Sequence, residues 1–163
     1  MENHCLSNSI ELLNEIYKNL RMGLQSIDVL ISSIKSNDII EELSDESSNY
    51  SLFEKETIMI ANAKDYNLKD NNIIQKTQVW LSVKMNLLTS MTTQHIAEMM
   101  LIGTMMGVID LVKATTNYLE ADKEIMDLAH KLIEEERRNI DKLFEYLKIK
   151  NYSDDKDIKN NID

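Results

Sequence analysis

The alternation of apolar and polar positions predicts four long helices, the first of which begins near the N-terminus. From Ser9 to about Ile34, apolar residues recur in steps of three and four, which is the spacing of one face of an α-helix. The run from Ser36 to Asp38 consists of good N-cap residues, so the chain is expected to turn there. The apolar face of this first helix consists of Ile10, Leu13, Tyr17, Leu20, Leu24, Ile27 and Ile31.

Three more segments show helical spacing. The second helix is predicted from about Asp38 to Lys64, with an inner face that is less apolar than that of the first. The third, from about Ser90 to Asn117, is apolar nearly all round, and a helix without a polar face has to be covered on every side. The fourth, from about Asp122 to Ile149, is cleanly amphipathic. The inner face of the second helix consists of Ile39, Leu43, Ser47, Tyr50, Glu54, Ile58 and Ala61.

A shorter amphipathic segment lies between the second and third helices. The polar stretch from Asp65 to Asn72 precedes it, and Ile73, Trp80 and Leu88 are among its apolar residues. Short turns join antiparallel neighbours, whereas these roughly 25 residues are enough to run along helices on the order of 40 Å long. We therefore predict a crossover that contains a short helix, and an up-down-down-up order of two hairpins.

Composition favours an all-α class and a single domain. The chain has no proline and only three glycines, so little interrupts helices and little forms the tight turns of sheets. Its 163 residues are the size of one domain. The predicted organisation is an N-terminal segment over 1–8, a four-helix bundle domain over 9–149 and a charged, Asn-rich, disordered tail over 150–163.

Charge and cysteine content restrict the partners and the compartment. The formal net charge of −10 and the lack of a Lys/Arg stripe set nucleic acid and anionic membranes aside. A single cysteine, Cys5, cannot form an internal disulfide, and the N-terminus lacks a secretion signal, so a cytoplasmic protein is predicted. The apolar stretch from Ile96 to Val112 includes Glu98 and Asp110 and is shorter than the roughly 20 residues that cross a bilayer, which favours a buried helix over a membrane span.

Ionisable residues inside an apolar helix face are the first candidates for chemistry, because a buried charge is costly unless it is paired or binds a metal. On the fourth helix, Glu136 points in the same direction as the apolar residues around it. On the second helix, Glu54 is the next candidate. Tyr50 lies one turn before Glu54 and could hydrogen-bond either carboxylate.

His95 and Glu98 lie three residues apart on the third helix, so they share one face, and this spacing suits either a shared metal or a hydrogen bond. The metal hypothesis is a site with iron or manganese as the candidate metals. Its ligands would be Glu54, His95, Glu98 and Glu136. The alternative is a buried polar network that sets the register of the helices. Its members would be Tyr50, His95, and Arg137 or Asn139.

Gly103 and Gly107 lie four residues apart and open a groove along the third helix. We interpret this groove as a tight helix crossing or a subunit contact rather than a ligand site. The methionines around it are expected to fill irregular core space, while an apolar ligand among them would need a pocket of several hundred cubic ångströms. The sequence has no Ser-His-Asp arrangement, glycine-rich phosphate loop or paired CxxC motif.

Three stretches of the sequence carry a family resemblance. They are Trp80-Leu-Ser-Val-Lys-Met-Asn-Leu-Leu-Thr, His95-Ile-Ala-Glu-Met-Met and Gly103-Thr-Met-Met-Gly107-Val-Ile-Asp110. Together with two helical hairpins and core carboxylates, they resemble the ferritin-like superfamily, and more narrowly uncharacterised ferritin-like proteins of low-GC Gram-positive bacteria. The resemblance covers about residues 5–148 and implies a ferritin-like four-helix bundle.

The resemblance also implies where a two-metal site would lie. Di-iron members of the superfamily carry Glu on the first and third helices and Glu-x-x-His on the second and fourth. The two His positions of this pattern fall on Thr57 and Asn139. Glu98 would serve on the third helix, whereas Glu11 and Glu15 on the first lie off its apolar face. The site is incomplete, which argues against ferroxidase or oxygenase chemistry.

The sequence therefore predicts a non-enzymatic, ferritin-like bundle that self-associates, with a dimer favoured, and acts as a structural, stress-related or interaction protein. The apolar third helix and its glycine groove motivate the self-association. The alternative is an iron- or manganese-binding ferritin-like protein with a degenerate carboxylate site.

Overall fold

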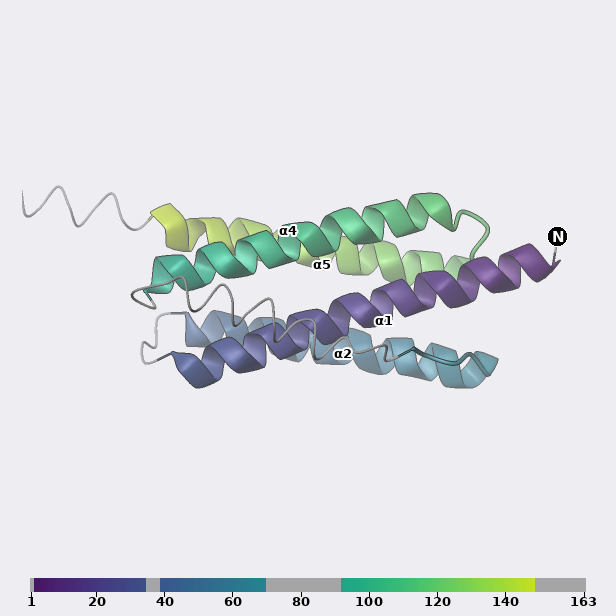
Figure 1. Cartoon of the computed structure of the whole chain (residues 1–163), viewed down its shortest axis with the longest axis horizontal. Coiled ribbons are helices and arrows are strands. Elements are labelled where there is room, and N and C mark those ends of the chain that lie inside the picture. The colour runs from purple at the N-terminus through teal and green to yellow at the C-terminus, as the bar shows by residue number, and fades with distance from the viewer. Residues whose placement is uncertain (1, 35–38, 70–91, 149–163) are drawn as a thin grey trace, which may run out of the picture.

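The computed structural model describes residues 2–34, 39–69 and 92–148, which form four α-helices and no strand (Figure 1). The all-α class predicted from the sequence is confirmed. The predicted short helix between the second and third long helices, and the predicted C-terminal tail over 150–163, lie outside the described residues. The helices are α1 (Glu2–Ser33), α2 (Ile40–Lys64), α4 (Thr93–Asn117) and α5 (Lys123–Lys148).

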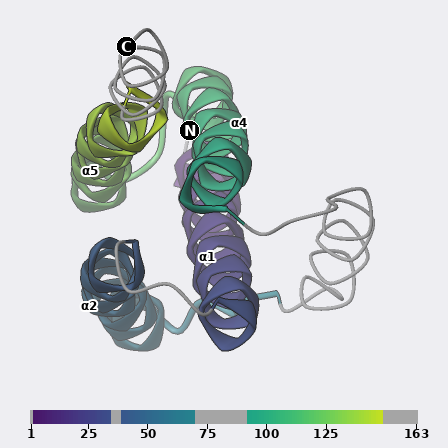
Figure 2. The same cartoon turned by 90° about the vertical axis from the view of Figure 1, so that its left-hand side faces the viewer.

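The four helices form a bundle. Helices α1 and α2 lie side by side, as do α4 and α5, and the end view shows α1 next to α4 (Figures 1 and 2). Apolar side chains from all four helices meet between them and are fully buried, which removes their surface from water and stabilises the bundle. They include Leu12, Ile16, Leu43, Ile96 and Leu132.

Helix α1 begins at Glu2 rather than at Ser9, where the apolar spacing begins. The additional turns pack against the connection between α4 and α5. The hydroxyl of Ser9 accepts a hydrogen bond from the backbone N–H of Asp122 at 2.8 Å, and the thiol of Cys5 donates to the Asp122 carboxylate at 3.5 Å. The ammonium of Lys64 reaches the same carboxylate at 2.9 Å. Asp122 therefore joins α1, α2 and the start of α5 at one end of the bundle.

Helix α4 contacts α5 and α1, and its opposite side faces outward. Exposed apolar residues lie on that side at Ile102, Met105, Ile109 and Val112. Among the described residues, the two neighbouring helices cover only part of the circumference of α4, so they do not provide the cover on every side that the sequence predicts. By length and composition α4 could cross a membrane, and 39% of its most apolar window is buried inside the bundle.

Candidate functional site

Glu136 is an ionisable residue at the centre of the bundle. It lies on the inner face of α5, among residues such as Leu132 and Ile133, and is 1% exposed. The prediction that it points into the core is confirmed. The reason is local, because α5 separates its apolar and polar residues so cleanly that the direction of each side chain follows from helical spacing.

Glu46 on α2 is a second buried carboxyl, also 1% exposed, and the sequence did not predict it. The buried side of α2 includes Leu43, Glu46, Tyr50 and Thr57, whereas the predicted face included Glu54. Apolar residues are spread around α2, so their spacing does not define one inner direction. The four buried positions follow one another in steps of three, four and seven residues, which is the spacing of one face of a helix. This spacing was the sequence signal that could have placed Glu46 on the buried side.

Tyr50 connects the two carboxyls. Its phenol interacts with both Glu46 and Glu136, and its side chain is 2% exposed. The ring also lies against the backbone of α1, because a Cβ at Gly23 would be only 2.6 Å from the Cε2 atom of Tyr50. Gly23 on α1 therefore makes room for the ring of Tyr50. We call Glu46 and Glu136, which this ring connects, the carboxyl pair.

Burial changes the protonation of the carboxyl pair. Desolvation is the main cause, and it raises the pKa of Glu46 to about 7 and that of Glu136 to about 8 from an ordinary value of 4.5. Repulsion from Glu42 adds to the rise at Glu46, and repulsion from Glu46 adds to the rise at Glu136. Desolvation and the two carboxyls raise the pKa of Tyr50 well above 10. Because the two carboxyls interact, they titrate as a pair, and the pair holds at least about one proton at neutral pH.

Several polar atoms of this cluster have no hydrogen-bond partner among the described residues. They are Oε1 of Glu46, Oε2 of Glu136, and both amide atoms of Asn139. Buried polar atoms without partners are uncommon and destabilise the folded state unless something else binds them. This part of the core therefore has capacity for a polar group that the described residues do not supply.

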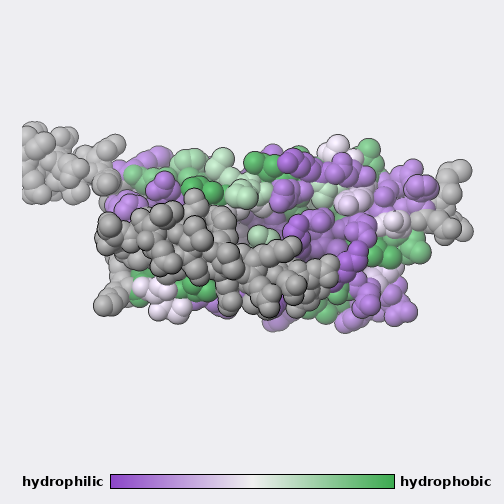
Figure 3. All heavy atoms as spheres, viewed as in Figure 1, coloured by the Kyte–Doolittle hydropathy of each residue, from purple (hydrophilic) through white to green (hydrophobic). Residues whose placement is uncertain are grey.

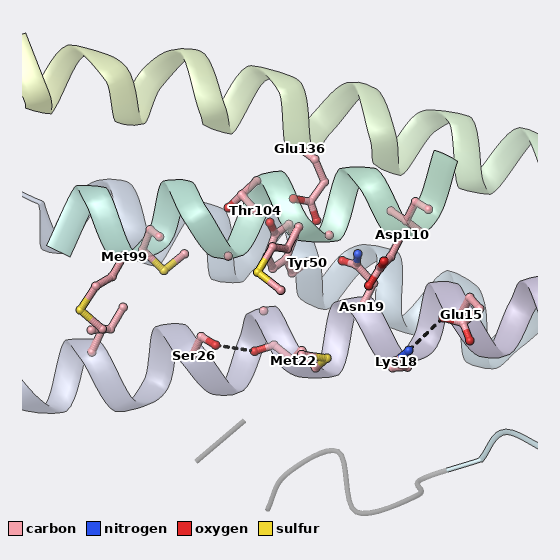
Figure 4. A pocket seen from close by; sticks show the side chains of 17 residues that line it. Glu15, Lys18, Asn19, Met22, Ser26, Tyr50, Met99, Thr104, Asp110 and Glu136 are labelled. Carbon is pink, nitrogen blue, oxygen red and sulfur yellow. Dashed lines mark hydrogen bonds and ion pairs between the residues drawn. The ribbon is translucent and has the colours of Figure 1, made fainter. Parts of the chain in front are cut away.

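A groove of about 300 Å³ lies between α1 and α4, and it reaches Glu136 of the carboxyl pair (Figure 4). Glu136 from α5 and Tyr50 from α2 line its deepest part, where Figure 4 shows them side by side. Polar side chains stand at its edge, including the ion pair between Lys18 and Glu15 at 3.1 Å. Its walls are mainly apolar and include Met22, Leu30, Met99, Met100 and Leu111.

The two glycines of α4 line this groove. A Cβ at Gly103 would meet no atom within 4 Å, and the nearest atoms to a Cβ at Gly107 belong to the side chain of Asn19, the first of them at 2.7 Å. No backbone in the described part of the chain crosses tightly at this pair. Among the described helices, the glycines therefore widen a groove instead of admitting another helix.

The four residues of the predicted metal site lie in different surroundings. Glu54 forms an ion pair with Arg21 of α1 at 3.2 Å, Glu98 is exposed, and His95 is half-buried near the start of α4. Only Glu136 lines the groove. Within residues 2–34, 39–69 and 92–148, no three His, Cys, Asp or Glu side chains are close enough to hold a metal ion. The described geometry does not supply the predicted donor set, and metal binding stays a prediction from the sequence.

Comparisons with models of known protein families, with curated proteins and with solved structures found no match. The ferritin-like resemblance accordingly stays a prediction from the sequence.

Proposed function

We propose that this protein is a non-enzymatic ligand-binding bundle, and that its groove receives a small molecule with an apolar body and a protonated amine at one end. The observation that carries the proposal is the carboxyl of Glu136, which is buried, has an acceptor oxygen without a partner, and lines the deepest part of an apolar groove. A buried acceptor without a partner, at the inner end of an apolar groove, favours a ligand with a hydrogen-bond donor at one end and an apolar body behind it.

The walls favour an apolar body. Ligand sites are typically concave and largely apolar, with few polar groups, and a volume of about 300 Å³ is at the lower end of their range. Burial of hydrocarbon against methionine and leucine would supply most of the binding free energy, at about 25 cal/mol per Å² removed from water. Methionine also adapts its shape, so the groove suits a flexible chain.

The carboxyl pair favours a cationic head. Carboxylates accept hydrogen bonds from an ammonium group, and a positive charge beside the pair would allow it to ionise despite its burial. A ligand carboxylate would instead meet groups that are already disfavoured as anions. The net charge of −10 acts in the same direction, because it attracts cations to the protein.

We expect octylamine to bind at least about tenfold more tightly than 1-octanol or octanoate at pH 8, because only the amine neutralises the carboxyl pair. Its affinity should rise between pH 6 and about pH 8, as Glu136 loses its proton. Isothermal titration calorimetry measures the affinities of the three ligands and the pH dependence of octylamine binding. Glu136→Gln should remove the preference for the amine, whereas Glu134→Gln, on the exposed side of the same helix, should keep it. Equal affinity for amine and alcohol would contradict the proposal, as would no binding of either.

We also propose the up-down-down-up order of ferritin-like bundles for this chain. The support is that α2 and α4 begin at the same end of the bundle in Figure 1, so that a connection between them has to return along its length. A crystal structure or a solution NMR structure of the full chain would test both this order and the predicted crossover helix.

A further inference from the structure

The outward side of α4 carries an apolar stripe that the groove does not use. Ile102, Met105, Ile109 and Val112 are 38%, 44%, 49% and 42% exposed, and none of them lines the groove. We call these four residues the outer seam. Figure 3 shows hydrophobic side chains over α4 on the face seen there. A stripe of this kind is larger than the single exposed apolar side chains that every protein surface carries.

The spacing of the outer seam is that of a helix–helix contact. Its members follow one another in steps of three, four and three residues, and further steps of four lead to Glu98 on one side and Thr116 on the other. This is the seven-residue repeat with which one helix packs its side chains into the gaps of another. The stripe therefore fits a helix, and a helix with the same spacing fits it best.

We infer that α4 of a second copy of this chain packs antiparallel on the outer seam. An antiparallel pair centred on Gly107 brings each seam residue opposite another seam residue. Ile102 faces the second copy's Val112, and Met105 faces the second copy's Ile109. In an antiparallel pair of helices, the first apolar position of the seven-residue repeat on one helix faces the fourth position on the other. Both pairs of seam residues follow this rule, so the stripe is complementary to itself.

Charges at the two ends of the outer seam favour this arrangement. Glu98 and Lys113 are both exposed, and neither makes an ion pair with any residue in the described part of the chain. The antiparallel pair places Glu98 beside the second copy's Lys113, and two-fold symmetry forms this contact twice. A parallel pair would place Glu98 against the second copy's Glu98, which is repulsive. Charge complementarity therefore selects a second copy in the antiparallel orientation.

A membrane fits the outer seam less well than a second copy. The opposite side of α4 contributes Ile96, Ala97 and Leu111 to the bundle core, so the helix cannot enter a bilayer without opening the fold. The net charge of −10 also opposes contact with anionic lipid. The dimer adds a subunit contact to the proposed ligand-binding function and does not depend on it, since the two surfaces share none of the four seam residues.

Sedimentation equilibrium of the full chain, from about 1 µM to about 1 mM, tests the proposal. We expect a monomer–dimer equilibrium, and Ile109→Glu should raise its Kd by at least about tenfold, because it buries a charge at the centre of the contact. Met59→Glu is the matched control, since Met59 is an exposed apolar residue of α2 and is 71% exposed. Its Kd should equal that of the unaltered chain, and circular dichroism should show both variants to be equally helical.

A charge exchange tests the orientation. Glu98→Lys should raise the Kd by about fivefold, and adding Lys113→Glu to it should restore the original Kd, because only the antiparallel pair joins these two positions. No effect of Glu98→Lys, or no restoration, would overturn the antiparallel arrangement. A chain that stays monomeric at about 1 mM would overturn the dimer. Cosedimentation of such a monomer with phosphatidylcholine vesicles would assign the outer seam to a membrane instead.

Discussion

Glu136→Gln is expected to raise the free energy of unfolding by about 5 kcal/mol at pH 9 and to change it little near pH 4.5. The cause is the pKa of Glu136, which burial raises from 4.5 to about 8. Between these two values the unfolded chain has released its proton while the folded chain still holds it. Raising the pH therefore favours the unfolded state, and this contribution to stability is lost as the pH rises through about 8. Glutamine resembles the protonated acid and does not titrate.

Urea unfolding followed by helical circular dichroism at both pH values measures this effect. Glu134→Gln is the control on the same helix, because Glu134 is exposed and pairs with Arg137 at the surface. Glu46→Gln should show the same behaviour over a narrower range that ends at about pH 7. If Glu136→Gln raised the free energy of unfolding by the same amount at both pH values, or lowered it at both, the ionisation of the buried carboxyl would not be the cause.

Gly23→Ala is expected to lower the free energy of unfolding by about 1–3 kcal/mol, although alanine is the better helix former. The added Cβ would lie 2.6 Å and 2.9 Å from two ring carbons of Tyr50, and that ring is buried and cannot move away freely. Displacing it would also disturb its contacts with the carboxyl pair. Thermal unfolding at a single pH is sufficient to measure the change.

Gly103→Ala is the matched control for this prediction, because a Cβ at Gly103 meets no atom within 4 Å. It should raise the free energy of unfolding by about 0.5–1 kcal/mol through helix propensity alone. Combining Gly23→Ala with Tyr50→Leu, which removes the ring, should cost less than the sum of the two single changes. Stabilisation by Gly23→Ala, or strict additivity in the double variant, would mean that the close contact does not restrict this position.

Local spacing was enough to predict several features of the molecule. The sequence by itself determined the all-α class, the four long helices to within a few residues at most of their ends, and the inward direction of Glu136. Each of these depends on residues within one helix, where a period of 3.6 residues sets the direction of every side chain. The start of α1 was the exception, because its first turns are held by contacts with Asp122, far away in the chain.

The remaining features required the tertiary structure, since they depend on how the helices are rotated and spaced. On α2, where apolar residues lie all round, contact with the other helices buries Glu46, while Glu54 pairs with Arg21. The groove depends on the separation of α1 and α4, so the glycine pair alone could not distinguish a crossing from a cavity. On α4, an all-apolar sequence cannot say which side stays outside. Packing decided that the outer seam remains exposed, because α1 and α5 leave that side of the helix uncovered.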